Sequence, residues 1–414
     1  LSKEIEQASK RAVNGLDLDW EVGVRTGDTS QKEKQKQRAA LPDILITTPE
    51  SLHLLLSQKK ASHLFRNLEC MVVDEWHELL GSKRAVQVEL ALSKLKSWHP
   101  KLRVWGISAT IGNMDDAMDI LMGTNPPKPK PVVIKANHEK QIEVVSILPD
   151  SVDELPWAGH LGIRLLEKVI PTIKKSKSCL IFTNTRSQAE IWYQRILEIA
   201  PDMAGLMAMH HGSISKELRF WVEDALYTGL LKAVVCTSSL DLGVDFRPVE
   251  NIIQVGSPKG VARFMQRAGR SGHQPGATSK IYFVPTHTLE LVEAAALREA
   301  IDQELIEERV PYLRSFDVLV QYLVTLAVGE GFRPDEVYAE IKSTFSYHSI
   351  SLEEWAWCLQ FIRNGGNSLS GYDEYHKVEL SDDGRYQVTR RRTAMRHRMS
   401  IGTIVGDGVV KVKF

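Results

Sequence analysis

The chain has 414 residues, of which 43% are hydrophobic and 25% are charged, and its 52 basic and 52 acidic residues give a formal net charge of zero. This composition is ordinary for a globular protein of two to three domains. It excludes a membrane-spanning stretch, because no long apolar run occurs, and it argues against a protein that coats nucleic acid through its bulk charge. The four cysteines are scattered without a CxxC pair, so neither a disulfide framework nor a cysteine metal site is expected.

The first part of the chain alternates short apolar runs with helical patterns. Strands are predicted at 43–48, 71–73 and 104–108, and helices at 52–56 and 86–95. This alternation predicts a mostly parallel sheet with helices on both faces. The proline-rich segment 126–131 then interrupts the pattern and predicts an extended surface segment.

A second block of the same kind follows. Strands are predicted at 179–183, 233–237, 251–255 and 281–284, with a helix at 187–197. Two successive blocks of alternating strands and helices predict two separate parallel-sheet domains.

From about Thr288 onward the chain is predicted to be mainly helical, with helices at 289–305, 316–328, 334–345 and 352–363. Ser351 is expected to cap the last of these helices, with Glu354 completing a capping box. Two short strand-like runs then flank the turn 381–385, which predicts a β-hairpin. Helices followed by a hairpin are typical of a winged helix. The stretch 385–398 carries six arginines and no acid, which indicates a basic site or a solvated surface.

The sequence Asp74-Glu75-Trp76-His77 directly follows the strand predicted at 71–73. Side chains at the carboxyl end of such a strand point into the ligand crevice of a parallel sheet. Two adjacent carboxylates there could hold a metal ion and activate a water for nucleotide hydrolysis. The alternative is that Asp74 and Glu75 merely begin a helix, where negative charge is favourable.

Three further polar segments follow predicted strands or glycine-containing turns. Ser108-Ala109-Thr110 could hydrogen-bond across the crevice, or could be an ordinary capped turn. The segment 237–245 offers hydroxyls and backbone N–H groups to phosphates, or is simply a polar loop. The segment 266–273 contains Arg267 and Arg270 among glycines, where a guanidinium could approach a phosphate, although a basic surface helix would look similar.

Taken in order, these segments resemble the motor core of superfamily 2 helicases of the DExH type, over roughly residues 1–290. Residues 74–77 match motif II, 108–110 motif III, 237–245 motif V and 266–272 motif VI. Residues 182–186 look like motif IV and 47–51 like motif Ib. Together with His210-His211-Gly212-Ser213 and the tail 396–404, they resemble the large helicase-related (Lhr) family, and most of all its bacterial DNA-ligase-associated DExH members.

This resemblance implies an α/β fold of two RecA-like motor domains, a winged helix and the start of a C-terminal domain. We place these parts at residues 1–145, 146–288, 289–392 and 393–414, respectively. The resemblance also implies the cofactors ATP and Mg²⁺, with Asp74 holding Mg²⁺ through water and Glu75 activating the attacking water. His77, Ser108 and Thr110 would couple the nucleotide cleft to the second motor domain.

The resemblance assigns further residues to the nucleotide and to the strand. Arg267 and Arg270 would approach the γ-phosphate, with Arg270 favoured. The nucleotide would also be lined by Gln266, Gly243 and Asp245. The residues expected along the nucleic-acid strand are Thr48, Thr183, Arg186, His211, Thr237, Ser238, Trp355 and Trp357. Core packing is the alternative for at least one of the two tryptophans.

The chain departs from the family pattern in one important respect. The phosphate-binding loop G-x-x-x-x-G-K-S/T occurs nowhere in the sequence. Since Leu1-Ser2-Lys3-Glu4 looks like the end of motif Ia, we expect the chain to begin downstream of that loop and to hydrolyse ATP poorly by itself. His273 also stands where many motif VI sequences have a third arginine.

The function expected from these residues is ATP-dependent, 3′-to-5′ translocation on single-stranded DNA or partial duplex in DNA repair. Two alternatives stay open: a nucleotide-independent nucleic-acid-binding remnant, and a helicase acting on RNA or RNA–DNA hybrid. A monomeric motor in the bacterial cytoplasm, associated with the nucleoid and with repair proteins such as a DNA ligase as possible partners, completes the expectation.

Overall fold

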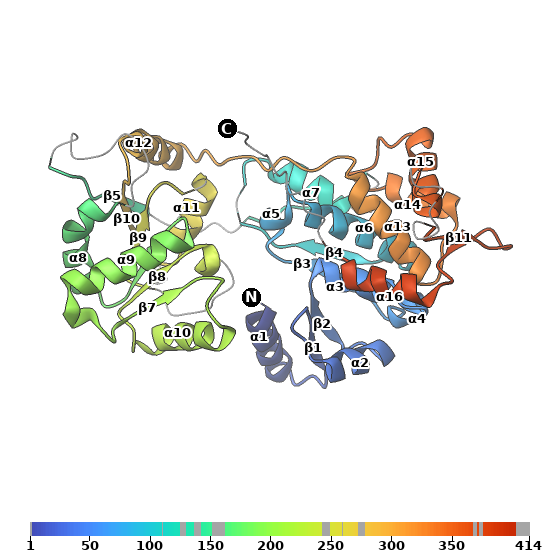
Figure 1. Cartoon of the computed structure of the whole chain (residues 1–414), viewed down its shortest axis with the longest axis horizontal. Helices are drawn as coiled ribbons and strands as arrows, with labels where there is room; N and C mark the ends of the chain where they lie inside the picture. Colours follow the sequence, from blue (N-terminus) through green and yellow to red (C-terminus); the bar gives the residue numbers. More distant parts are fainter. Residues whose placement is uncertain are drawn as a thin grey trace. The chain divides into compact units, whose positions relative to one another are not determined.

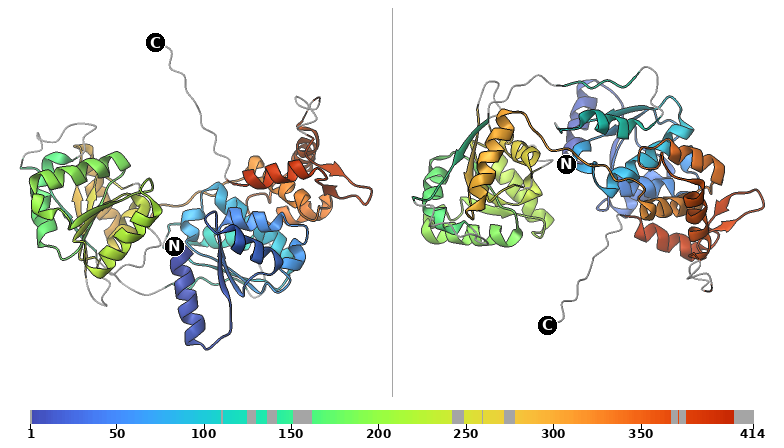
Figure 2. Two further views of the ribbon diagram at one scale, coloured as in Figure 1. Left: turned by 60° about the horizontal axis from the view of Figure 1, so that its bottom comes forward. Right: turned by 90° about the horizontal axis from the view of Figure 1, so that it is seen from above.

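The computed structural model describes residues 2–109, 111–124, 130–135, 142–150, 162–241, 249–258, 260–271, 278–366, 371 and 376–402. The chain divides into two compact units (Figures 1 and 2). The second motor unit runs from Lys135 to Glu307, and the composite unit combines Ser2–Ile134 with the chain from Glu308 onward. Within the described residues, no helix is long and apolar enough to cross a membrane.

The second motor unit is built on a parallel sheet of six strands in the order β5-β10-β9-β6-β8-β7. The strands are β5 (Ile142–Ser146), β6 (Cys179–Phe182), β7 (Met207–His210), β8 (Ala233–Cys236), β9 (Asn251–Val255) and β10 (Ser279–Val284). The helices are α8 (Leu166–Lys175), α9 (Arg186–Ile199), α10 (Lys216–Thr228), α11 (Val261–Ala268) and α12 (Leu289–Asp302). Every residue of β6 and β8 is buried, as expected for central strands covered on both faces.

Alternation along the strands divides the core of this unit into two layers. Cys179 and Ile181 of β6 pack in one cluster with Trp192 of α9, whereas Leu180 and Phe182 pack in the other with helices α10 and α11. Successive side chains of a strand point to opposite faces, so both faces must be covered by helices. The predicted strands are therefore confirmed as strands of a RecA-like parallel sheet. The helix predicted at 187–197 is confirmed as α9, which covers one face of that sheet.

The boundaries of this unit differ from those predicted at 145/146 and 288/289. Strand β5 pairs with β10 and so belongs entirely to the second sheet, although its first four residues were assigned to the first domain. Helix α12 was assigned to the winged helix, but its Ala294 and Leu297 pack in the core of the second motor unit. Strand β5 carries only a weak apolar pattern at a sheet edge, which explains why the sequence did not reveal it.

The composite unit begins with the first motor domain, whose strands form two parallel pairs, β1-β2 and β3-β4. The strands are β1 (Val22–Arg25), β2 (Ile44–Thr47), β3 (Cys70–Val73) and β4 (Arg103–Gly106). The helices are α1 (Ser2–Gly15), α2 (Gln31–Ala39), α3 (Pro49–Leu56), α4 (Ala61–Leu64), α5 (Trp76–Leu79), α6 (Lys83–Trp98) and α7 (Met114–Met122). Val72 of β3 is 51% exposed and Trp105 of β4 is 63% exposed, so this strand pair has an open apolar side.

The composite unit also contains the predicted winged helix. Its elements are α13 (Phe316–Val328), α14 (Pro334–Lys342), α15 (Leu352–Asn364), the hairpin β11 (Glu379–Leu380) and β12 (Tyr386–Gln387), and α16 (Arg391–Ser400). The boundary predicted at 392/393 differs from the structure, because it divides α16 after its second residue. The predicted capping box is confirmed, because Ser351 and Glu354 each bond the other's backbone N–H. The predicted hairpin is confirmed as well, with Glu379 opposite Gln387.

The winged helix shares one continuous hydrophobic core with the first motor domain. Leu90 and Leu92 of α6 belong to the same cluster as Leu319 and Leu323 of α13 (Figure 1). Around this core, Lys94 of α6 pairs with Glu340 of α14 at 2.9 Å, and both side chains are largely buried. The two parts therefore fold against each other as one body.

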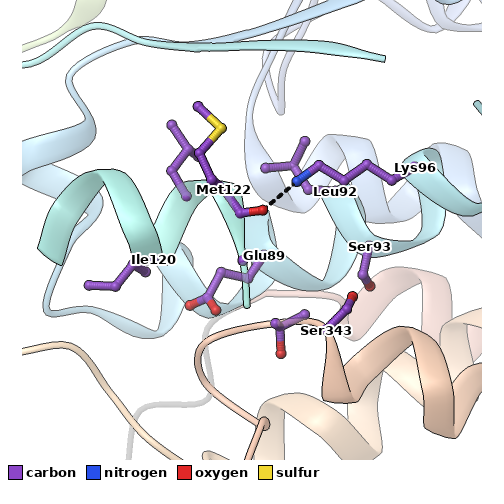
Figure 3. A pocket seen from close by; sticks show the side chains of 10 residues that line it. Glu89, Leu92, Ser93, Lys96, Ile120, Met122 and Ser343 are labelled. Carbon is purple, nitrogen blue, oxygen red and sulfur yellow. Dashed lines mark hydrogen bonds between the residues drawn. The ribbon is translucent and has the colours of Figure 1, made fainter. Parts of the chain in front are cut away.

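A buried carboxyl completes this joint. Glu89 of α6 accepts hydrogen bonds from the backbone N–H of Ser346 (2.9 Å) and from its hydroxyl (2.6 Å). Burial raises the pKa of Glu89 to about 7. A small pocket lies beside it, lined by residues of α6, α7 and the loop after α14 (Figure 3). None of the predicted nucleotide or strand residues lines this pocket, so it is part of the joint and not of the predicted site.

Candidate nucleotide site and strand-binding surface

Asp74 and Glu75 lie immediately after β3, as the sequence predicts. Both side chains are half-buried, and Asp74 Oδ1 accepts a hydrogen bond from the Glu75 N–H at 2.9 Å. Glu75 has φ 50° and ψ 41°, in the left-handed region that non-glycine residues rarely occupy. Such backbone strain costs about 1–3 kcal/mol and clusters at functional sites. It turns the chain between the end of β3 and the start of α5.

His77 connects the two carboxylates to the next strand. The ring is 1% exposed, and its Nδ1 accepts a hydrogen bond from the Ala109 N–H at 3.0 Å. Burial lowers the pKa of His77, so the ring is neutral near pH 7 and carries its proton on Nε2. That atom lies 3.4 Å from Glu75 Oε2. The predicted motif II is thereby joined to the predicted motif III through one imidazole.

The backbone around this site is fixed by β3 and β4. The Ile107 N–H donates to the Val73 carbonyl, and the Trp76 N–H donates to the Ile107 carbonyl, both at 2.9 Å. The Trp76 ring is buried, and its Nε1 donates to the Ala117 carbonyl at 2.8 Å. Trp76 is therefore a structural anchor that fixes the backbone directly after the two carboxylates.

The donor set at Asp74 fits a magnesium ion held through water. Asp74 Oδ2 makes no hydrogen bond to the described residues, and oxygen ligands are those that Mg²⁺ prefers. No group of three His, Cys, Asp or Glu side chains could hold a metal among the residues that the structure describes. Mg²⁺ typically uses one or two carboxylates, water and substrate phosphates, so a single carboxylate here is compatible with a metal that arrives with a nucleotide.

The predicted coupling residues are only partly described. The Ser108 hydroxyl donates to the Ala109 carbonyl at 2.7 Å, which stiffens the loop whose N–H contacts His77. Thr110 lies outside the described residues, as do Gly243 and Asp245 in the second motor unit.

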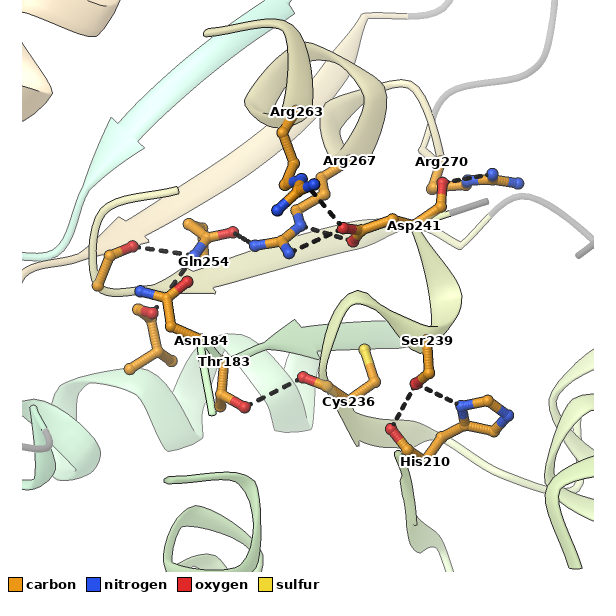
Figure 4. A network of polar contacts seen from close by, with 12 residues as sticks. Thr183, Asn184, His210, Cys236, Ser239, Asp241, Gln254, Arg263, Arg267 and Arg270 are labelled. Carbon is orange, nitrogen blue, oxygen red and sulfur yellow. Dashed lines mark hydrogen bonds and ion pairs between the residues drawn. The ribbon is translucent and has the colours of Figure 1, made fainter. Parts of the chain in front are cut away.

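Arg267 is the centre of a buried polar network in the second motor unit (Figure 4). Its Nε and Nη2 donate to the two carboxylate oxygens of Asp241 at 2.7 and 3.0 Å. Its Nη1 donates to Gln254 Oε1 at 2.6 Å, and its guanidinium stacks 4.7 Å from the centre of the Phe182 ring. Arg267 is only 2% exposed, so the prediction that it approaches a phosphate is wrong for this structure. All three guanidinium nitrogens of Arg267 already donate hydrogen bonds within this unit.

Arg270 remains the better phosphate candidate of the two arginines. It is half-buried, and its Nη2 donates to the Asp241 backbone carbonyl at 2.6 Å. Arg263, one turn before Arg267, lies with its Nε 3.5 Å from Asp241 Oδ2 and is partly exposed. Gln266 is half-buried on α11.

The predicted strand-contacting segments of this unit come together at one edge of the sheet. Strands β6, β8 and β7 are neighbours, and residues 183–186, 237–239 and 211–213 follow their carboxyl ends. Ser238 and Arg186 are exposed, and Thr237 is half-buried. The geometry therefore offers a polar surface of the kind that phosphate contacts require.

Two of the predicted strand residues are turned inward instead. Thr183 is fully buried, and its hydroxyl donates to the carbonyls of Cys236 and Thr185 at 3.2 Å, so its prediction as a direct strand contact is wrong for this structure. His211 is 4% exposed, with Nε2 3.7 Å from Glu190 Oε1. Glu190 also accepts from the exposed Arg186 at 2.8 Å, which lowers the pKa of Glu190.

The predicted strand residues of the composite unit also differ in exposure. Thr48 is half-buried at the start of α3, where its side chain accepts from the Ser51 N–H at 3.3 Å. Trp355 is 5% exposed and packs 5.6 Å from Tyr338, so it has the core role that was predicted as the alternative for at least one of the two tryptophans. Trp357 is 48% exposed and stacks on Phe361 with ring centres 5.2 Å apart.

The sequence analysis missed the carboxylate and the histidine that organise this surface. Asp241 lies inside the segment 237–245, and an acid there could have been recognised as a partner for an arginine. His210, at the end of β7, has its Nδ1 2.8 Å from the Ser239 hydroxyl (Figure 4). Its Nε2 lies 3.0 Å from Glu223 of α10, so the ring links Ser239 to Glu223. Only the sheet order reveals this link, because the three residues are far apart in the sequence.

Three family models match successive parts of the chain. Residues 1–117 match the DEAD/DEAH box helicase model, and residues 162–274 match the helicase conserved C-terminal domain. Residues 299–414 match the winged helix domain of the large helicase-related protein. The three models appear in the order in which the structure places two motor sheets and a winged helix.

Curated relatives match along nearly the whole chain. The chain is similar to the ATP-dependent helicase Lhr-Core protein 2 of Thermococcus barophilus, with 32% identity over 96% of this chain and 47% of the relative. It is also similar to the ATP-dependent helicase Lhr-Core of Sulfolobus acidocaldarius, with 34% identity over 95% of this chain and 45% of the relative. The chain thus spans about half the length of these relatives.

A solved structure shows the same likeness in three dimensions. It is the Mycobacterium smegmatis helicase Lhr bound to ssDNA and AMP-PNP, with a TM-score of 0.83 and 28% identity. The match covers 98% of this chain and 53% of that one.

Proposed function

The chain belongs to the large helicase-related (Lhr) family, and from this premise we propose that it is part of an ATP-driven motor that moves 3′ to 5′ on single-stranded DNA and unwinds duplexes during DNA repair. The direction of travel and the repair role rest on the family resemblance. The phosphate-binding loop of such a motor lies outside these 414 residues under this proposal, because the sequence contains no such loop.

One observation carries the hydrolytic part of the proposal. Asp74, Glu75 and His77 stand together at the end of β3, with Glu75 held in a strained backbone conformation and His77 hydrogen-bonded to Ala109. A merely structural helix start would require neither the strain nor a buried imidazole between two loops. Backbone strain of this kind is a reason to propose function.

Each residue then has a defined role. When ATP and Mg²⁺ are bound, they supply the γ-phosphoryl group and its charge neutralisation. Asp74 would hold the metal through water, and Glu75 would accept a proton from the attacking water. The His77 Nε2–H, 3.4 Å from Glu75 Oε2, would orient that carboxylate and relay its position to the loop at Ser108. Arg270 would supply positive charge from the second motor unit.

The strand side of the proposal rests on exposed polar residues at the carboxyl ends of the strands. Arg186, Thr237 and Ser238 would contact the phosphate backbone from the second motor unit, and Thr48 would do so from the composite unit. The similar helicase of Mycobacterium smegmatis was solved with ssDNA and AMP-PNP. We therefore propose single-stranded DNA as the track. A monomer working in the bacterial cytoplasm near the nucleoid, with repair proteins such as a DNA ligase as partners, completes the proposal.

Steady-state ATPase measurements on the protein, with any flanking sequence that its gene encodes, test this function. DNA, RNA and RNA–DNA hybrid are added in turn at fixed salt. Stimulation by DNA is expected, and a stronger response to RNA or hybrid would replace the proposed track by that alternative. Absence of ATP hydrolysis with every strand would overturn the motor.

A Glu75→Gln variant sharpens the same test. The amide keeps the shape of the side chain but cannot accept the proton, so kcat should fall at least about a hundredfold. Strand affinity should stay near that of the wild type, because Glu75 is not among the proposed strand contacts. Glu69→Gln, an exposed carboxylate just before β3, is the matched control and should leave kcat unchanged. A Glu75→Gln variant with normal turnover would remove Glu75 from its role.

The missing phosphate-binding loop supports a second candidate, a nucleotide-independent strand-binding protein. The two candidates differ in one measurement. Strand affinity that changes when AMP-PNP is added supports the motor, whereas identical affinity with and without AMP-PNP, in a protein that does not hydrolyse ATP, supports the binding protein.

A further inference from the structure

Helix α16 presents the most concentrated positive charge of the composite unit. Arg391, Arg392 and Arg396 are all exposed on this ten-residue helix, and the preceding segment adds the exposed Arg385. Arg391, Arg392 and Arg396 form no ion pair with a carboxylate among the described residues. A chain with zero net charge has thus gathered unneutralised arginines on one helix.

The position of these arginines on the helix is unfavourable in the absence of an anion. Arg391 and Arg392 occupy the first turn, where the helix dipole places partial positive charge. No acidic residue stands in this turn, and no side chain caps its free N–H groups. A helix start with unsatisfied N–H groups and two guanidinium groups attracts an anion through both features at once.

Neighbouring cations extend this positive surface. Arg396 lies near enough to Lys377 for its charge to contribute to lowering the pKa of Lys377, after the larger effect of burial. In the same way, Arg38 of α2 adds to burial in lowering the pKa of Arg398. Two pairs of cations, Arg396 with Lys377 and Arg398 with Arg38, therefore repel each other, and an approaching polyanion would relieve that repulsion.

Helix α16 is also held against the helix that begins at a proposed strand contact. Arg398 donates from Nη2 to the Ser57 carbonyl at 2.7 Å, at the end of α3, and α16 lies beside α3 and α13 (Figures 1 and 2). Thr48 caps the opposite end of α3. Since α3 has eight residues, the two ends are separated by about 12 Å. A strand that ran from Thr48 along α3 would reach the Arg398 end of α16, and Arg391 and Arg392 lie about 10 Å further along that helix.

We propose that α16 is a nucleic-acid backbone site, in which Arg391, Arg392 and Arg396 bind the phosphates of the strand that the motor holds. This inference rests on the proposed function and adds a contact outside the motor loops. The arginines carry no sequence preference, because phosphates are identical along a strand. They increase affinity and keep the strand against the composite unit.

The test is the salt dependence of strand binding by the 414-residue chain. A fluorescein-labelled oligo-dT strand is titrated by anisotropy at salt concentrations between about 50 and 200 mM. The triple variant Arg391→Ala/Arg392→Ala/Arg396→Ala should bind roughly tenfold more weakly near physiological salt. Its slope of log affinity against log salt should be smaller by about 2, since each lost phosphate contact to a single strand removes about 0.7.

A control with the same change in net charge separates a local site from bulk charge. The variant Lys101→Ala/Arg103→Ala/Lys342→Ala removes three exposed cations elsewhere in the composite unit, and it should retain wild-type affinity and slope. Equal weakening of both variants, or a triple α16 variant that binds like the wild type, would overturn the inference while the proposed function stands. A wild-type chain that binds no strand would overturn both. Unchanged thermal unfolding of the variants shows that the fold is intact.

Discussion

The six-stranded sheet of the second motor unit and the strand pair β3-β4 of the composite unit differ in how far their strands are covered. In the second motor unit, β6 and β8 are buried along their entire length. Arg267 of the predicted motif VI forms an ion pair with Asp241 inside the same unit. In the composite unit, β3 and β4 leave Val72 and Trp105 exposed, and the carboxylates at the end of β3 are half-buried. The second unit is stabilised by its own sheet, whereas the composite unit gains much of its core from the winged helix. The site with the proposed chemistry therefore depends on a module that follows it by more than two hundred residues.

The largest effect is expected at the buried ion pair of the second motor unit. Asp241→Asn removes the carboxylate charge and leaves the guanidinium of Arg267 buried without its partner, which costs about 3–5 kcal/mol of unfolding free energy. Urea denaturation of the chain, followed by hydrogen exchange on β6 and β8, measures this loss. The control Asp202→Asn breaks an exposed pair with Lys174 and should change nothing measurable. An equally small effect of Asp241→Asn would mean that this pair does not hold Arg267 in place. Arg267 would then again be a candidate to bind a phosphate.

Much of the fold could be predicted because its elements carry local patterns. The helix predicted at 316–328 coincides with α13, and the capping box at Ser351 is present. The union of the winged helix with the first motor domain could not be predicted, because periodicity shows which face of a helix is apolar but not what covers it. The buried face of α6 is especially hard to predict, because its polar residues Gln87 and Glu89 are buried together with the apolar ones.

The candidate site was predictable at the level of segments and less so at the level of side chains. Asp74, Glu75 and His77 lie where their position after a strand predicts, because a strand end fixes direction. Arg267 and Thr183 turn inward, since each meets a partner supplied by another strand or loop: Asp241 in one case and the Cys236 carbonyl in the other. Such partners lie 26 and 53 residues away and cannot be derived from local spacing.

Removing core volume from the winged helix tests whether it stabilises the first motor domain. Leu323→Ala leaves a cavity in α13 and should cost about 2–5 kcal/mol. Because α13 and α6 share one core, hydrogen-exchange protection of α6 should fall together with that of α13. The exposed Leu352→Ala on α15 is the control and should leave both unchanged. If α6 keeps its protection while α13 loses it, the two parts unfold independently and the composite unit is not one body.

Glu89 should make this joint sensitive to pH. Burial raises its pKa from 4.5 to about 7, so between these values the folded chain keeps a proton that the unfolded chain has released. Stability should therefore decrease as the pH rises through this window, by roughly 3 kcal/mol, and level off above it. Glu89→Gln imitates the protonated group and should be more stable than the wild type at pH 8, with little difference near pH 5.

The difference between wild type and Glu89→Gln is needed because another buried group titrates in the opposite sense. Burial lowers the pKa of His397 to about 4, so its contribution to stability is lost as the pH falls below its ordinary value of 6.5. The His397 effect is the same in both proteins and cancels. A pH-independent difference between them would show that Glu89 is ionised in the folded joint, and that the joint tolerates the charge.

The smallest effect is expected at the exposed tryptophan of the winged helix, and it concerns affinity and not stability. Trp357 is half-exposed and already stacked on Phe361, so a base could stack only on its outer side. Trp357→Ala should therefore weaken strand binding by about 1 kcal/mol, the lower end of the range for base stacking, with little change in unfolding. Trp221→Ala is the matched control: it is 53% exposed, and it lies on α10 of the second motor unit and is not among the predicted strand contacts. Equal affinity of the wild type and Trp357→Ala would leave the winged helix with a backbone contact through α16 alone, and would make the composite unit a phosphate-tracking surface without base stacking.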